Sequence, residues 1–319
     1  MDYIRVDPHV HCRDGKQAYK TTIKEVFALA DSQGVKKIFD MPNTDPPITL
    51  EKHVKERLEL VPPDRKDDYY LYIGATSDET QLEEAVYCYY NYPQVIGIKM
   101  FAGKSVGDLE IVELENQRKV YNTLTELGYG GVLAVHCEKE SFMRPKVWDP
   151  EDPITHSKAR PREAEIGSVE DQIDLVKETK FRGKLHICHI SVPEAVNLVD
   201  SARDNMKITC AATPHHLKWD STIQNLKNGL MYKMNPPLRS VGDTVRLRKY
   251  TLKGKIDWIE TDHAPHTEKE KLEDYMSGYP SLTKYNELVD NFLPNLGASK
   301  ELIKKLTHDN IYNTFKNKL

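Results

Sequence analysis

Two histidines separated by one residue lie near the start of the chain, in Asp7-Pro8-His9-Val10-His11. In extended backbone the side chains repeat with a period of two, so the imidazoles of His9 and His11 point the same way. Together they could hold one divalent cation, for which imidazole nitrogen is a common ligand. The alternative is two half-buried polar residues at a strand edge. Further ligands at the ends of later strands would favour a metal site.

Three more candidate ligands follow later apolar runs, namely His136, His189 and Asp262. A carboxylate directly after a buried strand, as at Asp262, is costly unless a cation or hydrogen-bond donors meet it. Four imidazoles and one carboxylate form the mixture of nitrogen and oxygen ligands that zinc takes in proteins. We therefore predict that these five residues converge on a metal site.

Lys99 lies near the end of the apolar run at 95–101. A buried ammonium is costly unless it is paired or neutralised, and the usual outcome is a side chain that extends to the rim. The alternative is a lysine whose lowered pKa allows its neutral amine to react with carbon dioxide. The product, a carbamate, is an anion with two oxygens that could bridge two cations.

The elements that must position these residues are short β-branched runs, which alternate with charged amphipathic stretches. The runs are 3–9, 35–41, 69–75, 95–101, 131–136, 184–189, 207–212 and 256–261, and the helix-like stretches are 22–32, 50–61, 79–90, 110–127, 162–179, 193–204, 241–252, 282–292 and 300–307. This alternation predicts one α/β domain over residues 1–319, a (β/α)8 TIM barrel whose chemistry lies at the carboxyl ends of its strands. An open doubly wound sheet is the alternative, but no G-x-G-x-x-G follows any run.

Side-chain parity decides which residues in a barrel strand face its axis. His186 and His189 have opposite parity, so we expect only His189, at the tip of its strand, to face inward. Cys188 has the wrong parity to bind the same ions, and we expect it to be a small packing residue. Asn43 follows the second run in a proline-rich loop, where it either forms an Asx turn or faces the site.

The composition excludes several classes of function. The net charge is -4, with 45 Lys and Arg and 49 Asp and Glu mixed along the chain, which gives no electrostatic case for nucleic acid or an anionic membrane. The five cysteines are scattered, as in the reduced thiols of cytosolic enzymes. There is no signal-peptide pattern and no apolar run of about 18 residues, the length of a membrane span. We expect a cytoplasmic protein that acts on a small-molecule substrate.

Nine stretches, in order along the chain, resemble the amidohydrolase superfamily and within it the dihydroorotase family. They are DPHVHCRDG at 7–15, MPNTDPP at 41–47, GIKMF at 97–101, VHCE at 135–138, ARPREAE at 159–165, HICHIS at 186–191, TPHHL at 213–217, KMNPPLR at 233–239 and TDHAPH at 261–266. The stretch GIKMF resembles the branch of the family that carries a lysine at this position. Because strand one starts almost at the first residue, we expect that the flanking β-domain of many bacterial members is absent.

The resemblance implies two Zn²⁺ ions, one held by His9, His11 and Asp262 and the other by His136 and His189. Lys99, carboxylated on its side-chain nitrogen, would bridge the ions together with a hydroxide. The resemblance also implies a set of substrate contacts: Arg13, Asn43 and His266 to a carboxylate, and Asn235 and the backbone around Ala264 to a pyrimidine ring.

The implied reaction is the reversible cyclisation of N-carbamoyl-L-aspartate to (S)-dihydroorotate in de novo pyrimidine biosynthesis. Hydroxide attacks the ring amide in the hydrolytic direction, and Asp262 carries its proton to the leaving nitrogen. Alternatives are a dihydropyrimidinase, hydantoinase or allantoinase, and an inactive scaffold for aspartate transcarbamoylase. Arg13 discriminates among the enzymes, because a guanidinium suits a carboxylate that the other substrates lack.

Two loops and the protein partners are left open by the sequence. The loop 101–107 contains glycines that permit motion, and Ser105 is the residue placed to reach substrate when the loop closes. The segment 278–283 replaces the glycine-rich stretch usual in the family, which puts the ring contacts there in doubt. A homodimer and an association with aspartate transcarbamoylase are the protein partners considered, and the sequence decides neither.

Overall fold

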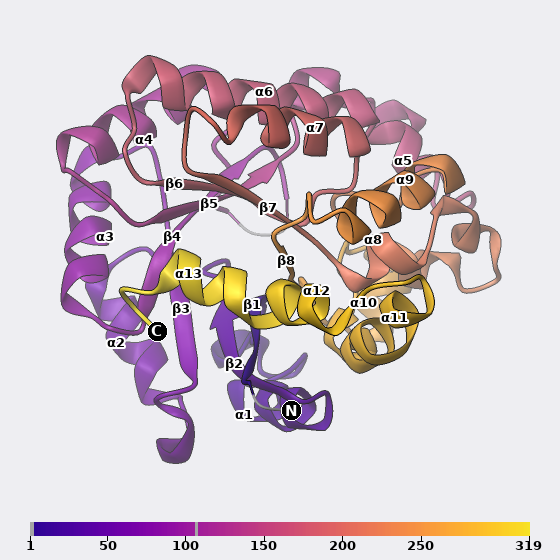
Figure 1. Ribbon diagram of the computed structural model, residues 1–319, viewed down its shortest axis with the longest axis horizontal. Coiled ribbons are helices and arrows are strands. Elements are labelled where there is room, and N and C mark those ends of the chain that lie inside the picture. Colours follow the sequence, from indigo (N-terminus) through magenta and orange to yellow (C-terminus); the bar gives the residue numbers. More distant parts are fainter. Residues whose placement is uncertain (1–2, 106–107) are drawn as a thin grey trace.

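The computed structural model describes residues 3–105 and 108–319, and eight parallel strands form its sheet (Figure 1). The strands pair in chain order from the first to the eighth. Their bounds are β1 Arg5–Val10, β2 Val35–Asp40, β3 Tyr69–Gly74, β4 Val95–Ala102, β5 Val132–Cys137, β6 Lys184–Ile187, β7 Ile208–Ala212 and β8 Trp258–Ile259. The predicted (β/α)8 barrel is confirmed.

The barrel closes between its first strand and the residues that follow β8. Val10 forms a parallel bridge with His263, and the His11 backbone N–H donates to the His263 carbonyl oxygen at 2.9 Å. The Asp7 carboxylate accepts from the Thr261 backbone N–H at 2.9 Å and from its hydroxyl at 2.6 Å. This closure brings Asp262, which lies between Thr261 and His263, beside the histidines of β1.

Helices surround the sheet, as Figure 1 shows. Their bounds are α1 Ile23–Ser32, α2 Glu51–Glu59, α3 Glu79–Asn91, α4 Leu114–Glu126, α5 Thr155–Ala159, α6 Arg162–Thr179, α7 Pro193–Ala202, α8 Pro214–Lys218, α9 Val241–Leu252, α10 Glu268–Leu272, α11 Leu293–Asn295, α12 Lys300–Lys304 and α13 Asn310–Phe315. In α1 the buried residues Ile23, Val26, Phe27 and Ala30 recur at the spacing of one helix face. Such apolar faces pack the helices onto the strands.

The barrel interior is apolar at the amino ends of the strands and polar at the carboxyl ends. Phe39 and Trp258 fill the lower interior, where Phe315 of α13 (yellow in Figure 1) packs against both, at ring-centroid distances of 5.1 Å and 6.0 Å. The candidate ligands occur at the opposite ends of the strands. The amino end is thus packed for stability, while the carboxyl end is available for chemistry.

Two predicted strands are shorter than their apolar runs. The run 184–189 is strand only as far as Ile187, and the run 256–261 is strand only at Trp258 and Ile259. His189 has a φ of 36°, in the left-handed region, so the backbone turns after Ile187. The parity rule therefore does not extend to His189.

The predicted C-terminal helices also differ in detail. The stretch 282–292 is a 3₁₀ turn at Ser281–Lys284 followed by a π-helix at Glu287–Phe292. Beyond α12 the chain continues as a second π-helix, Lys305–Asp309.

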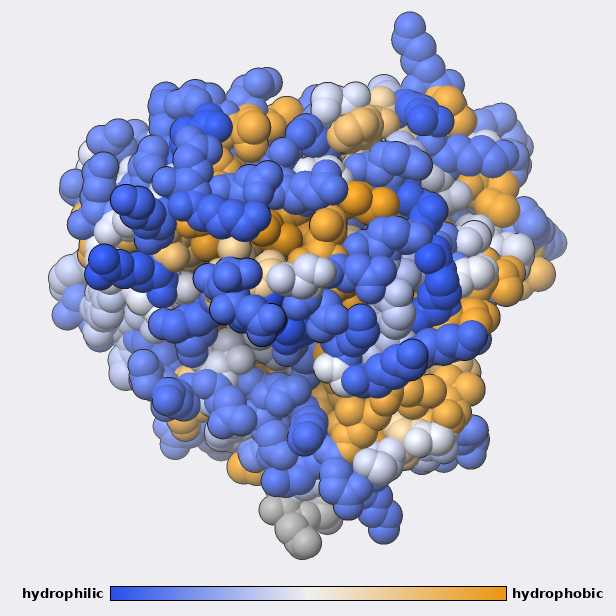
Figure 2. All heavy atoms as spheres, turned by 45° about the horizontal axis from the view of Figure 1, so that its top comes forward, coloured by the Kyte–Doolittle hydropathy of each residue, from blue (hydrophilic) through white to orange (hydrophobic). Residues whose placement is uncertain are grey.

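The outer surface is mainly hydrophilic on the face in Figure 2, with apolar residues exposed in patches between charged ones. Within residues 3–105 and 108–319, no helix combines the length and apolar composition that crossing a bilayer requires.

Candidate metal centre

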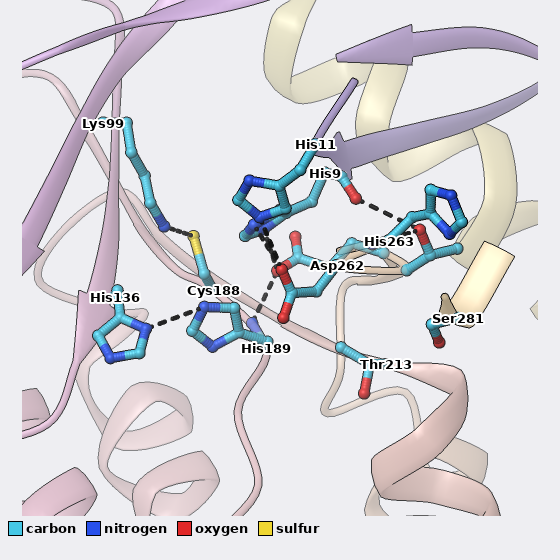
Figure 3. Close-up of polar contacts among 12 residues, drawn as sticks. His9, His11, Lys99, His136, Cys188, His189, Thr213, Asp262, His263 and Ser281 are labelled. Carbon is cyan, nitrogen blue, oxygen red and sulfur yellow. Dashed lines mark hydrogen bonds and ion pairs between the residues drawn. The ribbon is translucent and has the colours of Figure 1, made fainter. Parts of the chain in front are cut away.

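The first group of candidate ligands consists of His9, His11 and Asp262, all buried at the barrel mouth (Figure 3). The Asp262 Oδ1 atom lies 3.2 Å from His9 Nε2 and 2.9 Å from His11 Nε2. One ligand atom from each residue falls within 4.8 Å of the other two. The predicted convergence of β1 with the residue after β8 is therefore present in the structure.

The second group is His136, at the end of β5, and His189. His136 Nδ1 lies 3.2 Å from His189 Nε2, and the Nε2 atom of His136 lies 3.0 Å from Glu138 Oε2. Because Glu138 accepts only, it orients His136 with hydrogen on Nε2 and a lone pair on Nδ1. Two imidazole nitrogens at this separation are stabilised by a proton or a cation between them. The ring centroids of His9 and His189 are 5.2 Å apart, so the two groups adjoin.

Lys99 is completely buried, which rules out the interpretation that it extends to the rim. Its Nζ atom lies 3.0 Å from Cys188 Sγ (Figure 3). The same atom lies 4.9 Å from the Phe101 ring centroid. Among the described residues no carboxylate lies within ion-pair distance of it. A carbamate at this nitrogen would replace an unpaired buried cation with an anion that metal ions can bind.

The prediction that Cys188 has the wrong parity is incorrect. Its sulfur points into the barrel toward Lys99, and His9, Cys188 and Glu260 form a second set of potential ligands. Burial raises the pKa of the Cys188 thiol, but the Lys99 charge together with hydrogen bonds from His186 and His9 lowers the pKa to about 6. Cys188 keeps the inward direction of His186, two residues before it, and the left-handed turn at His189 brings the next side chain into the site as well.

The expectation that only His189 faces inward is also incorrect. His186 is buried inside the barrel, stacked on Trp258 at 4.3 Å, and its Nε2 lies 3.1 Å from Glu260 Oε2. Glu260 was not among the predicted site residues. The available signal was its position two residues before Asp262, which gives both carboxylates the same parity.

The electrostatics of the first group suit a divalent cation. Burial raises the pKa of Asp262, but His9 and His11 outweigh it and hold the pKa well below its usual value. Burial lowers the pKa of His11 to about 4 although Asp262 opposes this, and burial lowers the pKa of His189 well below its usual value. Near pH 7 Asp262 is therefore anionic and His11 and His189 are neutral, the protonation states that metal ligands require. Burial lowers the pKa of His9, but Glu260 and Asp262 outweigh it and raise the pKa well above its usual value, so His9 must release a proton to bind a cation.

A cavity opens above the two groups. The residues that line it are His9, His11, Arg13, Asn43, Phe101, Ser105, His136, His189, Asn235, Asp262, Ala264, Ser277 and Gly278. Among the predicted site residues, Lys99 and His266 are not part of this lining. Val106 and Gly107 of the predicted mobile loop lie outside the described residues.

Arg13 is a buried cation at this cavity, with 2% of its surface exposed. Its Nη2 atom lies 3.4 Å from His266 Nε2, while within the described chain its Nε and Nη1 atoms have no hydrogen-bond partner. Its backbone carbonyl accepts from Arg57 Nη1 at 2.8 Å, which fixes the left-handed turn at Arg13, φ 61°. A buried guanidinium with unused donors fits an anionic ligand.

One wall of the cavity includes Ser277, which the sequence did not indicate, and Gly278, the first residue of the segment 278–283. At Gly278 the φ is 150°, and a Cβ atom would lie 2.6 Å from the Ala264 carbonyl oxygen. Only glycine allows this close approach of the backbone to Ala264 and His266. Asn235 lies on the same wall, with its Oδ1 3.0 Å from His156 Nε2.

The donor set fits zinc on observations of this structure. Nitrogen and carboxylate oxygen atoms from separate elements meet at short distances, and the buried Nδ1 atoms of His11 and His189 lack partners within residues 3–105 and 108–319. Such buried polar atoms are costly unless a ligand, water or ion meets them. The residues present could therefore hold two divalent cations.

No protein-family model matches the chain. Among curated proteins, it is 28% identical to the dihydroorotase of Methanosphaera stadtmanae, covering 97% of this chain and 70% of that protein. It is 31% identical to the dihydroorotase of Aeropyrum pernix, covering 83% of this chain and 58% of the relative. It is 31% identical to the dihydroorotase of Pyrococcus furiosus, covering 94% of this chain and 64% of that protein. The chain thus spans roughly three fifths to seven tenths of the length of these relatives.

Solved structures share the fold. The L-hydantoinase (dihydropyrimidinase) of Arthrobacter aurescens superposes with a TM-score of 0.86 at 21% identity, covering 98% of this chain and 70% of that one. The dihydroorotase of Campylobacter jejuni superposes with a TM-score of 0.73 at 19% identity, covering 98% of this chain and 83% of that one. Over most of its length this chain is therefore similar in sequence to dihydroorotases, and it shares its fold with the solved hydantoinase and dihydroorotase.

Proposed function

We propose that this chain is a zinc-dependent dihydroorotase that interconverts N-carbamoyl-L-aspartate and (S)-dihydroorotate in de novo pyrimidine biosynthesis. The observation that carries the proposal is Arg13, a buried guanidinium at the same cavity as the candidate metal ligands. Both the substrate and the product carry a carboxylate that can occupy its unused donors. The names of the sequence relatives support the same activity.

In this proposal one Zn²⁺ would be held by His9, His11 and Asp262 and the other by His136 and His189. A carbamate on Lys99 would supply a further anionic ligand, which would give its buried nitrogen a role that the bare amine lacks. When bound, the ions supply Lewis-acid chemistry and make water ionise near neutral pH.

Asp262 is the proposed proton carrier. It accepts the proton of the attacking water and delivers it to the leaving ring nitrogen, so one carboxyl group serves as base and then as acid. In the cyclising direction the same group takes a proton from the carbamoyl nitrogen.

Residues that line the cavity, together with His266 beside Arg13, hold the substrate. Arg13, Asn43 and His266 receive its carboxylate, while Asn235 and the Ala264 backbone contact the ring. Because the cavity lies against the buried ligands, bound substrate excludes water from the reacting carbonyl. Ser105 also lines the cavity and is the proposed contact of the loop that carries it.

The proposed setting is the cytoplasm, with the small-molecule substrate as the main partner. A homodimer and an association with aspartate transcarbamoylase are further proposals. Native mass spectrometry of the protein alone and with aspartate transcarbamoylase would test both.

The decisive experiment is a steady-state assay of dihydroorotate hydrolysis and of the reverse cyclisation. We expect turnover in both directions, loss of activity on treatment with a chelator, and recovery on addition of Zn²⁺. Hydantoin, dihydrouracil and allantoin serve as comparison substrates. Absence of dihydroorotate turnover by zinc-loaded protein would refute the proposal, and efficient turnover of a comparison substrate would favour another cyclic amidohydrolase.

A further inference from the structure

We propose that Glu260 is a positioning residue that orients one ligand from each half of the metal centre, His9 and His189, for binding a pair of divalent cations. This inference rests on the proposed function, because it concerns the same centre. Glu260 follows β8 and is 1% exposed, so its carboxylate is placed inside the barrel beneath the ligands. It is not among the residues that line the cavity.

The first contact sets the orientation of His9. Glu260 Oε1 lies 3.1 Å from His9 Nδ1. An ionised carboxylate only accepts hydrogen bonds, so the hydrogen of the neutral ring resides on Nδ1. The Nε2 lone pair is then directed toward Asp262 and His11, where the first cation would lie.

The second contact is to the backbone of His189. The same Oε1 atom accepts from the His189 backbone N–H at 2.7 Å. His189 has a left-handed φ of 36°, which a residue with a side chain adopts only when its surroundings hold it there. This turn directs the imidazole toward His136, 3.2 Å away. Glu260 therefore stabilises the backbone that presents a ligand of the second cation.

The other carboxylate oxygen fixes the orientation of Glu260 itself. Oε2 lies 3.1 Å from His186 Nε2 and accepts from Trp258 Nε1 at 3.2 Å. His186 is held in turn by Thr209 Oγ1 at 3.0 Å and by stacking on Trp258. Four nitrogen donors thus surround the two oxygens.

These four hydrogen bonds to the Glu260 carboxylate distinguish a positioning role from direct binding of a metal ion. Glu260 lies close enough to His9 and Cys188 to count as a potential metal ligand. To bind a cation, however, Oε1 would have to give up the hydrogen bonds that orient His9 and His189. The observed contacts therefore favour a carboxylate that acts through the ligands rather than on the metal.

The test is the zinc affinity of the full-length protein carrying Glu260→Gln, measured by competition with a chromophoric chelator. The carboxamide is nearly isosteric, but its NH₂ group cannot accept from the N–H donors around it. We expect zinc affinity to fall by about 10- to 100-fold, the usual effect of losing a residue that orients a metal ligand. The Co²⁺ absorption spectrum should change as well, because the ligand geometry changes.

The matched control is Asp257→Asn, a carboxylate just before β8 that accepts from Arg203 and from the Cys210 backbone N–H, each at 2.8 Å. We expect this variant to lower the melting temperature and to leave zinc affinity and the Co²⁺ spectrum unchanged. If Glu260→Gln does not fold, His186→Phe keeps a ring on Trp258 but removes one donor to Glu260. We expect His186→Phe, like Glu260→Gln, to bind zinc more weakly than the wild type.

Wild-type zinc affinity and an unchanged Co²⁺ spectrum in a folded variant would overturn the positioning role. The role would also be overturned if the Asp257→Asn control lost zinc affinity to the same extent, because the effect would then be a general loss of structure. The affinities are measured without substrate, so the result does not depend on dihydroorotate turnover. A wild-type protein that binds zinc but does not hydrolyse dihydroorotate would refute the proposed function alone.

Discussion

At the scale of single residues, Arg13 is the feature that distinguishes one cyclic amide substrate from another. It is buried, its pKa is lowered by burial, and two of its nitrogens lack partners within the described chain. A buried cation without an anionic partner lowers the stability of the free protein, and a bound anion offsets this loss.

Replacing Arg13 by alanine should reduce kcat/KM for dihydroorotate by about 100- to 10,000-fold, because each hydrogen bond to a charged group contributes about 1.5–3 kcal/mol and two would be lost. Arg13→Lys should recover only part of the loss, since an ammonium does not reproduce the planar fork. Steady-state kinetics of the three proteins provide the measurement. Unchanged dihydroorotate turnover by Arg13→Ala would show that Arg13 does not bind the substrate carboxylate.

At the scale of elements, the segment that follows α10 forms one wall of the cavity and is held by two buried lysines. Lys271 Nζ donates to the carbonyl oxygens of Lys233 and Gly278, each at 2.7 Å. Lys233 Nζ donates to the Tyr275 carbonyl at 2.7 Å and to Ser277 Oγ at 2.9 Å. The wall residues Ser277 and Gly278 are therefore fixed by side chains from two separate segments.

Gly278→Ala should disturb this wall. The new methyl group would lie 2.6 Å from the Ala264 carbonyl, at a φ of 150° that strains any residue with a Cβ atom. We expect a lower melting temperature and a higher KM. Gly254→Ala is the matched control, because its φ is 72° and no atom lies within 4 Å of the added Cβ in the described structure. A KM as high in the control as in Gly278→Ala would contradict the steric explanation.

The buried lysine also makes stability depend on pH. Burial, together with the Lys233 charge, lowers the pKa of Lys271 to about 7 from an ordinary value of 10.5. Between these values the unfolded chain binds a proton that the folded chain does not, so the free energy of unfolding should rise with pH across this window. The buried Lys271 side chain therefore destabilises the fold least above its ordinary pKa of 10.5, and this destabilisation grows as the pH falls toward 7.

Urea unfolding of the chelator-treated protein between pH 7 and 10 measures this dependence. Lys271→Met removes the titrating group, so we expect its free energy of unfolding to change less with pH than that of the wild type. The difference between the two proteins across this range should be a few kcal/mol, on the order of 1.4 kcal/mol per unit of pKa shift. Parallel curves for the two proteins would contradict the assignment.

At the scale of the whole molecule, the metal centre joins parts of the chain that are remote in sequence. Its candidate ligands come from β1, from the end of β5, from the turn after β6 and from the residue that closes the barrel after β8. Bound cations would therefore connect the first strand to the last third of the chain, so that the folded state gains stability from metal binding.

Removal of zinc should lower the melting temperature. At a free zinc concentration 100-fold above Kd, one bound ion stabilises the fold by about 2.7 kcal/mol, which corresponds to roughly 5 °C for a domain of this size. Calorimetry with and without a chelator measures the difference. His11→Ala should reduce the zinc-dependent shift, whereas equal shifts in both proteins would place zinc elsewhere.

The fold was predictable because its signal is local and repeated. Each apolar run and each amphipathic stretch can be recognised within about ten residues, and their alternation specifies the barrel.

The predictions of side-chain direction fail where the backbone leaves regular structure. Strand β6 ends before Cys188, and the left-handed turn at His189 reverses the facing that parity predicts. A positive φ at a histidine depends on tertiary hydrogen bonds, which the sequence does not display.

The sequence by itself determined the barrel, the strand tips that carry His9, His11, His136, His189 and Asp262, and the resemblance to dihydroorotases, because these depend on periodic patterns and on residue types at fixed order. The tertiary structure alone decided that Cys188 and His186 face inward and that Arg13 is buried with unused donors. It also revealed Glu260 beneath the ligands and Ser277-Gly278 at the cavity wall. These features arise from contacts between residues far apart in the chain, and their energies depend on distance and burial in the folded molecule.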